Sequence, residues 1–307
     1  MTELTAVVVG CGAVGSDYDA GREGEPPLSH AGAYRAHEAT KLVAGVDREP
    51  EARRRFEQRW SVPAYDEVGT ALTEHGPALV SICTPGETHL EVVRKAVGGG
   101  AKGLWVEKPL AGTRAEAAEL LEAAAGIALQ VNFLRRFDPL HRRVVEVASP
   151  DLVHADMRYS GTLSNFGSHA IDLFRWLAGE VSSVETLRAP DGEPVLFLAS
   201  ERGPTASLSR VQPGTTEIFE AYLFTNRGLM TLTGLGEQLT TWEAAASGLF
   251  AGATQLGPPI TDPERGLVGA MTGGVESLVS HLRSGTPLLC RGDDGLATLA
   301  VIEAAER

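Results

Sequence analysis

Short apolar runs alternate with charged, amphipathic segments through the first 132 residues. The apolar runs predict strands at 6–9, 41–46, 79–83, 104–106 and 127–131. Helices are predicted at 51–60, at 87–97, and from the capping-box pattern of Thr113 and Glu116 to about residue 125. Runs without polar alternation are typical of strands that are buried on both faces. The alternation of strands and helices therefore predicts a doubly wound, parallel α/β sheet.

The pattern changes in the second part of the chain. Helices are predicted at 139–147, in the later part of 163–177, at 271–283 and at 295–307, and residues 153–159 alternate like a strand with one exposed face. Further strand-like runs lie at 194–198, 205–211, 218–225 and 229–232, separated by glycine and proline turns, and 247–266 is expected to be a long loop. This pattern predicts an open, mainly antiparallel sheet with a few helices.

Composition and charge narrow the class of protein. The hydrophobic fraction of 43% and the charged fraction of 22% are ordinary for a globular protein, and 307 residues suffice for two domains. A net charge of −13 argues against a nucleic-acid partner. The apolar run 6–9 is too short to span a membrane, and the N-terminus lacks the basic region of a signal peptide. Cys11, Cys83 and Cys290 form no CxxC pair, so the sequence suggests no metal site and no disulfide framework, and the cytoplasm is the expected compartment.

A glycine motif follows the first strand directly. It reads Gly10-Cys-Gly12-Ala13-Val14-Gly15, which is the fingerprint of dinucleotide binding. The first glycine allows a tight turn, the second lets the backbone approach a pyrophosphate, and the third lets the helix pack on the strand. The motif predicts that NAD or NADP binds here, with the pyrophosphate at a helix N-terminus.

The fingerprint also needs an acidic residue at the end of the second strand. Asp47 occupies that place and can accept both ribose hydroxyls, while Arg48 could tolerate a 2′-phosphate, so NAD is only slightly favoured over NADP. The separation of 32 residues from Gly15 to Asp47 exceeds the usual value of about 20. The excess lies in residues 16–27, an expected inserted loop that is either a lid or a passive surface insertion.

A lysine lies at the end of another predicted strand. Lys108 precedes Pro109, which cannot extend a sheet ladder, so the strand stops there. Ligands of open α/β sheets bind at this edge. His169 begins a helix in the second domain. If the two domains meet at the cleft, His169 could move the proton of an alcohol while Lys108 stabilises the alkoxide.

These motifs together resemble the Gfo/Idh/MocA family, the relatives of glucose-fructose oxidoreductase and inositol dehydrogenase. The resemblance rests on the glycine motif, on Cys83-Thr84-Pro85 with His89, on Glu107-Lys108-Pro109, on Asn132-Phe-Leu-Arg135-Arg136-Phe137, and on Gly167-Ser-His169-Ala-Ile-Asp172-Leu. It covers nearly the whole chain.

The resemblance implies a Rossmann domain at 1–132 and a substrate and oligomerisation domain at 133–307, whose last helix packs back on the first. It implies that Lys108 contacts nicotinamide ribose and substrate, with Glu107, Thr84 and Pro85 at the cofactor, and that His169 is the acid/base. It also raises the expectation of a cis Lys108–Pro109 bond above the low frequency of cis X-Pro bonds in general. The substrate would be a sugar, sugar derivative or cyclitol, and the family sheet often forms a homodimer or homotetramer.

One position departs from the family. Asn165 stands four residues before His169, where the family usually has a catalytic Asp, and an amide cannot raise the pKa of an imidazole as a carboxylate does. Asn165, Asp172, Asn132 and Arg136 are candidate substrate-binding residues, with local structural roles as the alternative. The main hypothesis is a dehydrogenase or ketosugar reductase. Two rivals stay open: an enzyme that uses bound NAD transiently for hydrolysis, elimination or epimerisation, and a cofactor-binding regulator without turnover.

Overall fold

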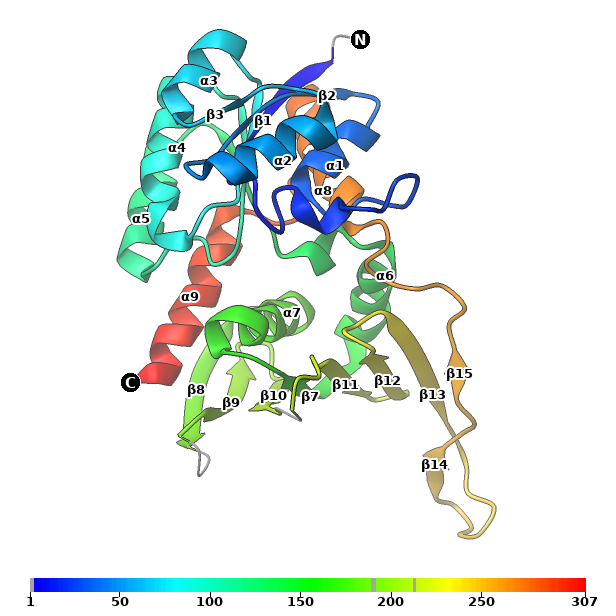
Figure 1. Ribbon diagram of the computed structural model, residues 1–307. Coiled ribbons are helices and arrows are strands. Elements are labelled where there is room, and N and C mark those ends of the chain that lie inside the picture. Colours follow the sequence, from blue (N-terminus) through cyan, green and yellow to red (C-terminus); the bar gives the residue numbers. More distant parts are fainter. Residues whose placement is uncertain (1–2, 189–191, 212–213) are drawn as a thin grey trace. The chain divides into compact units, whose positions relative to one another are not determined.

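The chain divides into two compact units. The computed structural model describes residues 3–188, 192–211 and 214–307. The first unit runs to Phe137 and also contains Val268–Leu299, and the second comprises Asp138–Leu267 and Ala300–Arg307. Each unit contains its own sheet (Figure 1). No helix among the described residues is both long and apolar enough to cross a membrane.

The first unit is built on a six-stranded parallel sheet. Its strands are β1 (Leu4–Val9), β2 (Thr40–Val46), β3 (Ala64–Tyr65), β4 (Leu79–Ile82), β5 (Gly103–Val106) and β6 (Ala128–Val131). Their order is β3-β2-β1-β4-β5-β6, so the order reverses beside β1. Val7 and Val8 of β1 are fully buried, and burial of such a side chain stabilises the fold by about 1.5–3 kcal/mol.

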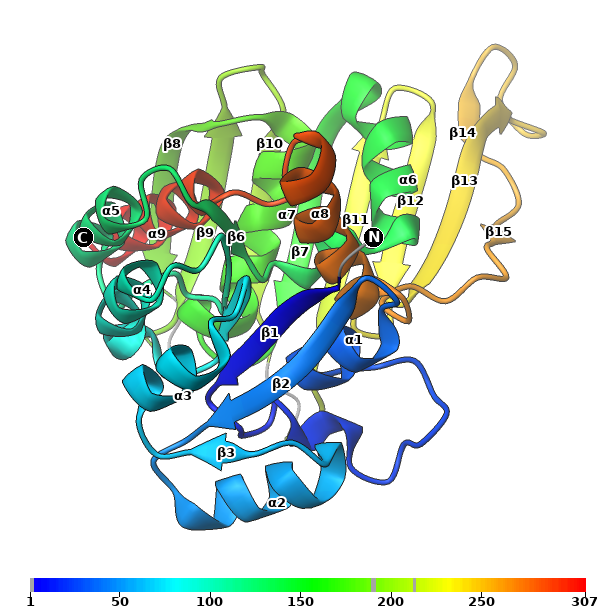
Figure 2. The same cartoon turned by 90° about the horizontal axis from the view of Figure 1, so that it is seen from above.

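Helices cover both faces of this sheet. They are α1 (His30–Ala36), α2 (Pro50–Trp60), α3 (Val68–His75), α4 (His89–Gly98), α5 (Arg114–Ala123) and α8 (Ala270–Ser284), followed by α9 (Gly292–Glu306), which begins in this unit. Helices α3, α4 and α5 lie on one face, and α1 and α8 lie on the other (Figures 1 and 2). The capping box predicted at Thr113 and Glu116 is present at the start of α5.

Helix α8 packs on this sheet although it is distant in sequence. A Cβ at Gly274 would lie 2.4 Å from Cζ2 of the fully buried Trp105 on β5. The Gly274 carbonyl also accepts a hydrogen bond of 2.9 Å from the Gln130 amide on β6. The missing side chain thus lets α8 approach the sheet closely, which explains why Val268–Leu299 belongs to the first unit.

The second unit is built on a mixed, mainly antiparallel sheet. Its strands are β7 (Leu152–Tyr159), β8 (Val181–Arg188), β9 (Pro194–Ser200), β10 (Thr205–Arg210), β11 (Phe219–Thr225), β12 (Gly228–Thr233), β13 (Gln238–Ala246), β14 (Thr254–Leu256) and β15 (Ile260–Thr261). The order is β14-β13-β12-β11-β7-β10-β9-β8, with β15 beside β13, and β7 and β10 pair in parallel. Helices α6 (Pro139–Ala148) and α7 (Ser168–Ala178) also belong to this unit, and α7 contacts β7 and β10.

The predicted fold class is confirmed, and the Lys108–Pro109 bond is cis. One element prediction is wrong, because residues 247–266 contain β14 and β15 rather than only a loop. The pattern also did not reveal β3, α3, β8 or β13. The strands among these elements are very short or rich in polar residues, so they carry little of the apolar periodicity on which such predictions depend.

Candidate functional site: a dinucleotide pocket and a lysine at the sheet edge

The three glycines of the motif have three different surroundings. Gly10 has φ +95°, and a Cβ there would lie 2.6 Å from the Cys83 carbonyl oxygen. A Cβ at Gly15 would lie 1.9 Å from the Gly10 carbonyl oxygen. At Gly12 a Cβ would meet no protein atom within 4 Å. Gly10 and Gly15 are therefore needed for the turn itself, whereas Gly12 faces open space into which a phosphate could fit.

The insertion after the motif interrupts the first helix without destroying it. The Gly12 carbonyl accepts hydrogen bonds from the amides of Ser16 and Asp17, but the Val14 carbonyl accepts from His30 and the Gly15 carbonyl from Ala31, both at 3.0 Å. Helical hydrogen bonding thus passes from the glycine loop directly to α1, and residues 16–29 leave the helix as an excursion. Without these 14 residues, Gly15 and Asp47 would be 18 positions apart, close to the usual spacing of about 20.

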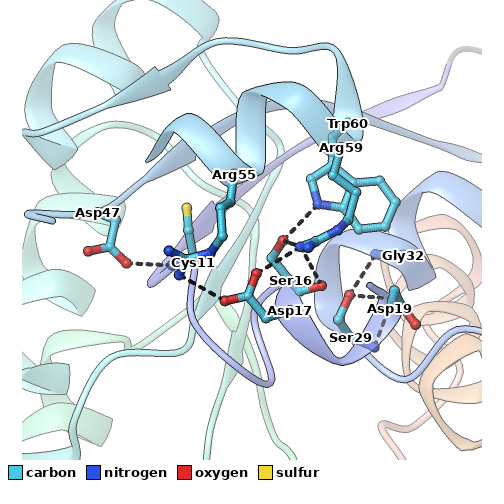
Figure 3. Close-up of polar contacts among 10 residues, drawn as sticks. All are labelled: Cys11, Ser16, Asp17, Asp19, Ser29, Gly32, Asp47, Arg55, Arg59 and Trp60. Atoms are coloured by element: carbon cyan, nitrogen blue, oxygen red, sulfur yellow. Dashed lines mark hydrogen bonds and ion pairs between the residues drawn. The ribbon is translucent and has the colours of Figure 1, made fainter. Parts of the chain in front are cut away.

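The start of the excursion, at Ser16 and Asp17, is bound to α2 by ion pairs and hydrogen bonds, as Figure 3 shows. The Asp17 carboxylate pairs with Arg55 at 3.0 Å and with Arg59 at 2.9 Å. Arg59 also donates to the Ser16 carbonyl and hydroxyl, and the Trp60 indole donates to the same hydroxyl at 2.9 Å. Partial burial raises the pKa of Asp17, but the two arginines outweigh it and hold that pKa below its usual value.

The second side is tied to the start of α1. Asp19 accepts from the amides of Leu28 and Ser29, at 2.7 and 3.1 Å, and from the Ser29 hydroxyl. Ser29 in turn caps α1 by accepting from the Gly32 amide at 3.1 Å. Residues 16–27 therefore form the inserted loop expected from the sequence, and its base is held on both sides.

A pocket of about 560 Å³ lies at the carboxyl edge of the parallel sheet. Of the cofactor-binding residues predicted from the sequence, Gly10, Gly12, Asp47, Arg48, Thr84 and Pro85 line it. Ala13, Val14, Gly15, Glu107 and Lys108 are not among its lining residues. Gly12 and Asp47, the two positions that the fingerprint assigns to pyrophosphate and ribose, thus meet in one hollow, which fits a dinucleotide.

Asp47 is fixed to the glycine loop. Its carboxylate accepts from the amide of Cys11 at 2.8 Å and from the amide of Glu49 at 2.9 Å (Figure 3 shows the first). Burial and the charge of Asp47 raise the pKa of the Cys11 thiol well above its usual value, so this side chain stays neutral.

The pocket lining is mostly negative. It contains six carboxylates and two cations, and the side chain of Lys95 pairs with one of the carboxylates, Glu91, at 2.6 Å. The carboxylates are Asp47, Glu49, Asp66, Glu67, Glu87 and Glu91. Such a lining repels an additional phosphate more than a neutral ribose hydroxyl.

Lys108 follows β5 and is partly buried. Its neighbour Glu107 is only 8% exposed and accepts hydrogen bonds from the His30 ring at 2.9 Å, from the Asn132 amide, and from the Lys108 backbone amide at 3.2 Å. Burial raises the pKa of Glu107, but His30, Asn132 and Lys108 hold it below its usual value, so the carboxylate is charged at neutral pH. Burial and Arg135 lower the pKa of Lys108, and the Glu107 charge opposes both.

His89 joins the two segments that border this edge. One ring nitrogen lies 2.7 Å from the Thr84 carbonyl oxygen, and the other lies 3.1 Å from the Leu110 carbonyl oxygen. The residue is fully buried. His89 thus connects the Thr84-Pro85 turn to the segment after the cis bond, and these contacts give it a structural role.

In the second unit, Asn165 and His169 lie on a continuous turn-and-helix segment. The Thr162 hydroxyl accepts a hydrogen bond from the backbone amide of Asn165 at 3.2 Å. Thr162 thereby caps a π-helical turn, Leu163–Gly167. His169 is the second residue of α7 and is 7% exposed, whereas the Asn165 side chain is exposed. The turn thus places Asn165 one turn ahead of His169 along the chain.

Other predicted substrate-binding residues have local partners. Asp172 is 2% exposed and lies 3.9 Å from Arg175 on its own helix, and Arg136 pairs with Asp294 at 3.1 Å within the first unit. Asn132 donates to Glu107 rather than capping a helix. These contacts favour the local structural alternative for the three residues.

Sequence reasoning missed the buried hydrogen-bonded chain that ends at Glu107. Its members Tyr34, Ser81 and His30 carry no motif, and only the folded chain brings them to Glu107.

Comparison with known proteins agrees with this geometry. Residues 4–133 match the oxidoreductase family with an NAD-binding Rossmann fold, Gfo/Idh/MocA. The inositol 2-dehydrogenase of Paracoccus denitrificans is 32% identical over 190 residues, which cover 55% of this chain and 53% of that protein. The rhizopine catabolism protein MocA of Rhizobium meliloti is 25% identical, with 80% of each chain covered. The chain spans about half the length of the first curated relatives that it matches.

A solved structure extends the similarity in fold to the whole chain. The UDP-N-acetylglucosamine 3-dehydrogenase GnnA of Acidithiobacillus ferrooxidans superposes with a TM-score of 0.78 at 19% identity, covering 100% of this chain and 99% of that one. Residues 4–133 thus match the NAD-binding Rossmann part of the Gfo/Idh/MocA oxidoreductase family, and the complete chain shares its fold with GnnA.

Proposed function

We propose that this protein transfers a hydride between nicotinamide and a secondary alcohol or ketone of a sugar, sugar derivative or cyclitol. The observation that carries the proposal is the carboxyl edge of the parallel sheet, where Gly12, Asp47 and Thr84 line one pocket and Lys108 follows the next strand. The inositol and sugar dehydrogenases among the relatives support the substrate class.

Each chemical role has a residue that suits it. Bound nicotinamide accepts or supplies the hydride. In oxidation, His169 takes the hydroxyl proton while the charge of Lys108 stabilises the developing alkoxide, and the carbon that loses hydride becomes the carbonyl. In reduction, His169 returns that proton to the oxygen. Asn165 orients the substrate, with Asn132, Asp172 and Arg136 as further candidates whose local contacts limit their reach.

NAD is the proposed cofactor rather than NADP. A 2′-phosphate next to Asp47 would face the mostly negative lining of the pocket. Within the described part of the chain, the Asp47 carboxylate accepts hydrogen bonds from two backbone amides, and a carboxylate has about four acceptor positions, so it can still accept from both ribose hydroxyls.

The open sheet is the proposed oligomer interface. Phe197 and Phe224 are 42% and 44% exposed, although they lie on strands inside the sheet. We expect a homodimer or homotetramer, to be measured by sedimentation, and Phe224→Asp should shift the mass towards the monomer. A wild-type protein that sediments as a monomer would contradict this expectation.

The test of activity is the absorbance of reduced nicotinamide. The protein is incubated with NAD or NADP and a panel of inositols, free sugars, sugar phosphates and nucleotide sugars, and the corresponding ketosugars are tested with NADH or NADPH. His169→Ala is the catalytic control, and His281→Ala, which alters a histidine on α8, is the matched control. A signal with one substrate class that is lost only in His169→Ala supports the proposal. Silence in both directions, with NAD binding shown separately, contradicts it.

A regulator without turnover is the second candidate, because Asn165 replaces the usual Asp. Binding of NAD without chemistry, together with a protein that is captured only in its presence, would favour this reading.

A further inference from the structure

A buried chain of side chains leads from the interior of the first unit to Glu107. The hydroxyls of Tyr34 and Ser81 are hydrogen-bonded at 2.9 Å, and the Ser81 hydroxyl lies 2.8 Å from Nδ1 of His30. Nε2 of His30 lies 2.9 Å from Oε1 of Glu107. Tyr34, Ser81 and His30 are fully buried. A buried polar chain of this kind persists only if its members satisfy one another, so it fixes the orientation of each.

The charge of Glu107 determines which group donates in the hydrogen bond between His30 and Glu107. The Glu107 carboxylate is ionised and therefore only accepts, so Nε2 of His30 carries the proton and donates. The Ser81 hydroxyl is hydrogen-bonded to the other ring nitrogen of His30, Nδ1. The His30 ring is held from a third side by Trp105, whose ring centre lies 4.0 Å away. His30 thus presents one N–H to Glu107 in a fixed geometry.

Glu107 connects this chain to the lysine at the sheet edge. Its Oε1 accepts hydrogen bonds from the His30 ring and the Asn132 side-chain amide. Its Oε2 accepts a hydrogen bond from the backbone amide of Lys108. The carboxylate therefore holds the backbone of the residue that would act on substrate. The Glu107 charge also raises the pKa of Lys108 and thus favours its ammonium form.

The excursion determines where His30 lies relative to the buried hydrogen-bonded side chains. His30 is the first residue of α1, and its amide continues the helical hydrogen bonding from Val14. The preceding residue, Ser29, is fixed by Asp19. The anchored base of the excursion therefore determines the position at which the helix resumes and, with it, the position of the His30 ring.

We propose that His30, set by the anchored excursion 16–29, is a positioning residue for Lys108 that acts through the Glu107 carboxylate. This inference rests on the proposed function, in which Lys108 stabilises the alkoxide. The proposal connects the base of the excursion to Lys108 through His30 and Glu107. This connection does not depend on whether the outer part of the excursion moves.

The inference has an electrostatic consequence. Among the charged groups that influence Lys108 are Glu107, which raises its pKa, and Arg135, which lowers it. The titratable groups around Glu107 are His30, Lys108 and the Cys83 thiol, whose own pKa is raised by burial and by Glu107. If the donor from His30 is lost, the Glu107 carboxylate becomes easier to protonate and freer to move. Lys108 then loses its ammonium proton at a lower pH.

Two substitutions at His30 separate positioning from general packing. The side-chain amide of Gln reaches about as far as Nε2, so His30→Gln keeps the donor to Glu107. The amide of Asn reaches only as far as Nδ1, so His30→Asn keeps a partner for Ser81 and loses the bond to Glu107. His37→Gln, at the C-cap of the same helix, is the matched control, because His37 pairs with Glu276 and not with Glu107. Thermal unfolding checks that all variants are folded.

We expect His30→Asn to lower kcat at least about tenfold and to move the alkaline limb of kcat/KM down by about one pH unit. His30→Gln should retain most of the activity and the wild-type pH profile, and NAD affinity should be unchanged in both variants. If His30→Asn and His30→Gln behave alike, or if the alkaline limb does not move in His30→Asn, the inference is wrong.

A second readout does not depend on turnover. The rate at which an amine-reactive reagent labels Lys108 is measured against pH by mass spectrometry, in the wild type and in both His30 variants. Labelling should increase at lower pH in His30→Asn than in His30→Gln. If this shift appears in a protein that turns over no substrate, the proposed function fails while the positioning inference stands. Equal labelling curves overturn the inference even if the protein is an active dehydrogenase.

Discussion

The backbone amide of Cys11 donates a 2.8 Å hydrogen bond to Oδ2 of Asp47, which joins the middle of the glycine loop to the end of β2. The carboxylate that we propose binds the ribose is thereby fixed relative to the loop that we propose receives the pyrophosphate. One residue thus couples the two halves of the dinucleotide pocket.

Replacing Asp47 with Asn should weaken NAD binding and reduce the preference for NAD over NADP. An amide offers one acceptor oxygen instead of two and carries no charge, so we expect NAD affinity to fall about tenfold, roughly 1.4 kcal/mol. The affinity for NADP should change less, because its repulsion by the pocket is relieved. Titration calorimetry of both cofactors measures this difference. Glu119→Gln, an exposed carboxylate on α5, is the control, and a wild type that binds NADP more tightly than NAD would refute the argument from charge.

The three glycines should respond differently to alanine. Gly12→Ala places a methyl group in open space, so thermal stability should be unchanged while NAD affinity is lost by a factor of ten or more, roughly 1.4 kcal/mol at least. Gly15→Ala creates a contact of 1.9 Å with the Gly10 carbonyl, so the unfolding temperature should fall. Differential scanning calorimetry with and without NAD distinguishes the two. If Gly12→Ala still binds NAD normally, the pyrophosphate does not lie at this glycine.

Replacing Lys108 with Met should remove turnover but leave cofactor binding largely intact. Loss of a charge that stabilises an alkoxide typically lowers kcat by about 10²–10³-fold. Lys102→Met, just before β5, is the matched control because its side chain is exposed. NAD affinity and steady-state kinetics are measured for both variants. Unchanged turnover in Lys108→Met would remove the central catalytic assignment.

Replacing Asn165 with Asp restores the residue type that the family usually carries. A carboxylate near His169 favours the protonated imidazole, so a pH limb that requires neutral His169 should move to higher pH, by up to about one unit because Asn165 is exposed. Ser164→Asp, which adds the same charge at the neighbouring exposed position, is the control. An equal shift in both variants would mean that the carboxylate acts only through general charge and not from the position of residue 165.

Replacing Asp17 with Asn should destabilise the base of the excursion in a pH-dependent way. The pKa of Asp17 is lower in the folded chain than in the unfolded chain, so its stabilising effect is fully present above the unfolded pKa and is lost as pH falls through the folded one. At pH 7 we expect the variant to lose about 1 kcal/mol, allowing for partial exposure of the carboxylate.

Urea unfolding of the wild type and Asp17→Asn at pH 7 and at pH 3 measures this difference, which should shrink at the lower pH. Glu25→Gln, an exposed carboxylate on the same excursion, is the control and should have little effect at either pH. A constant difference between pH 7 and pH 3 would show that Asp17 acts through packing rather than through its charge.

The sequence by itself determined the architecture and the cofactor motif. The β-branched run before Gly10, the glycine spacing and Asp47 are local features, and hydrophobic periodicity reports directly which faces of an element are buried. The excess length before Asp47 also identified the excursion. The sequence could not show that helical hydrogen bonds pass from Val14 and Gly15 to His30 and Ala31, because such bonds depend on how the chain returns after residue 29.

Only the tertiary structure determined the surroundings of Glu107. His30 and Tyr34 come from α1 and Ser81 from β4, and Tyr34, Ser81 and His30 are 73, 26 and 77 positions away from Glu107 in the sequence. No periodicity or spacing rule links α1 to Ser81 or to Glu107, since each residue looks like an ordinary polar position on its own. Packing α8 against Trp105 through Gly274 is a contact of the same kind, made over more than 160 residues of chain. Local patterns specify elements and loop motifs, whereas buried polar networks depend on which elements the completed core brings into contact.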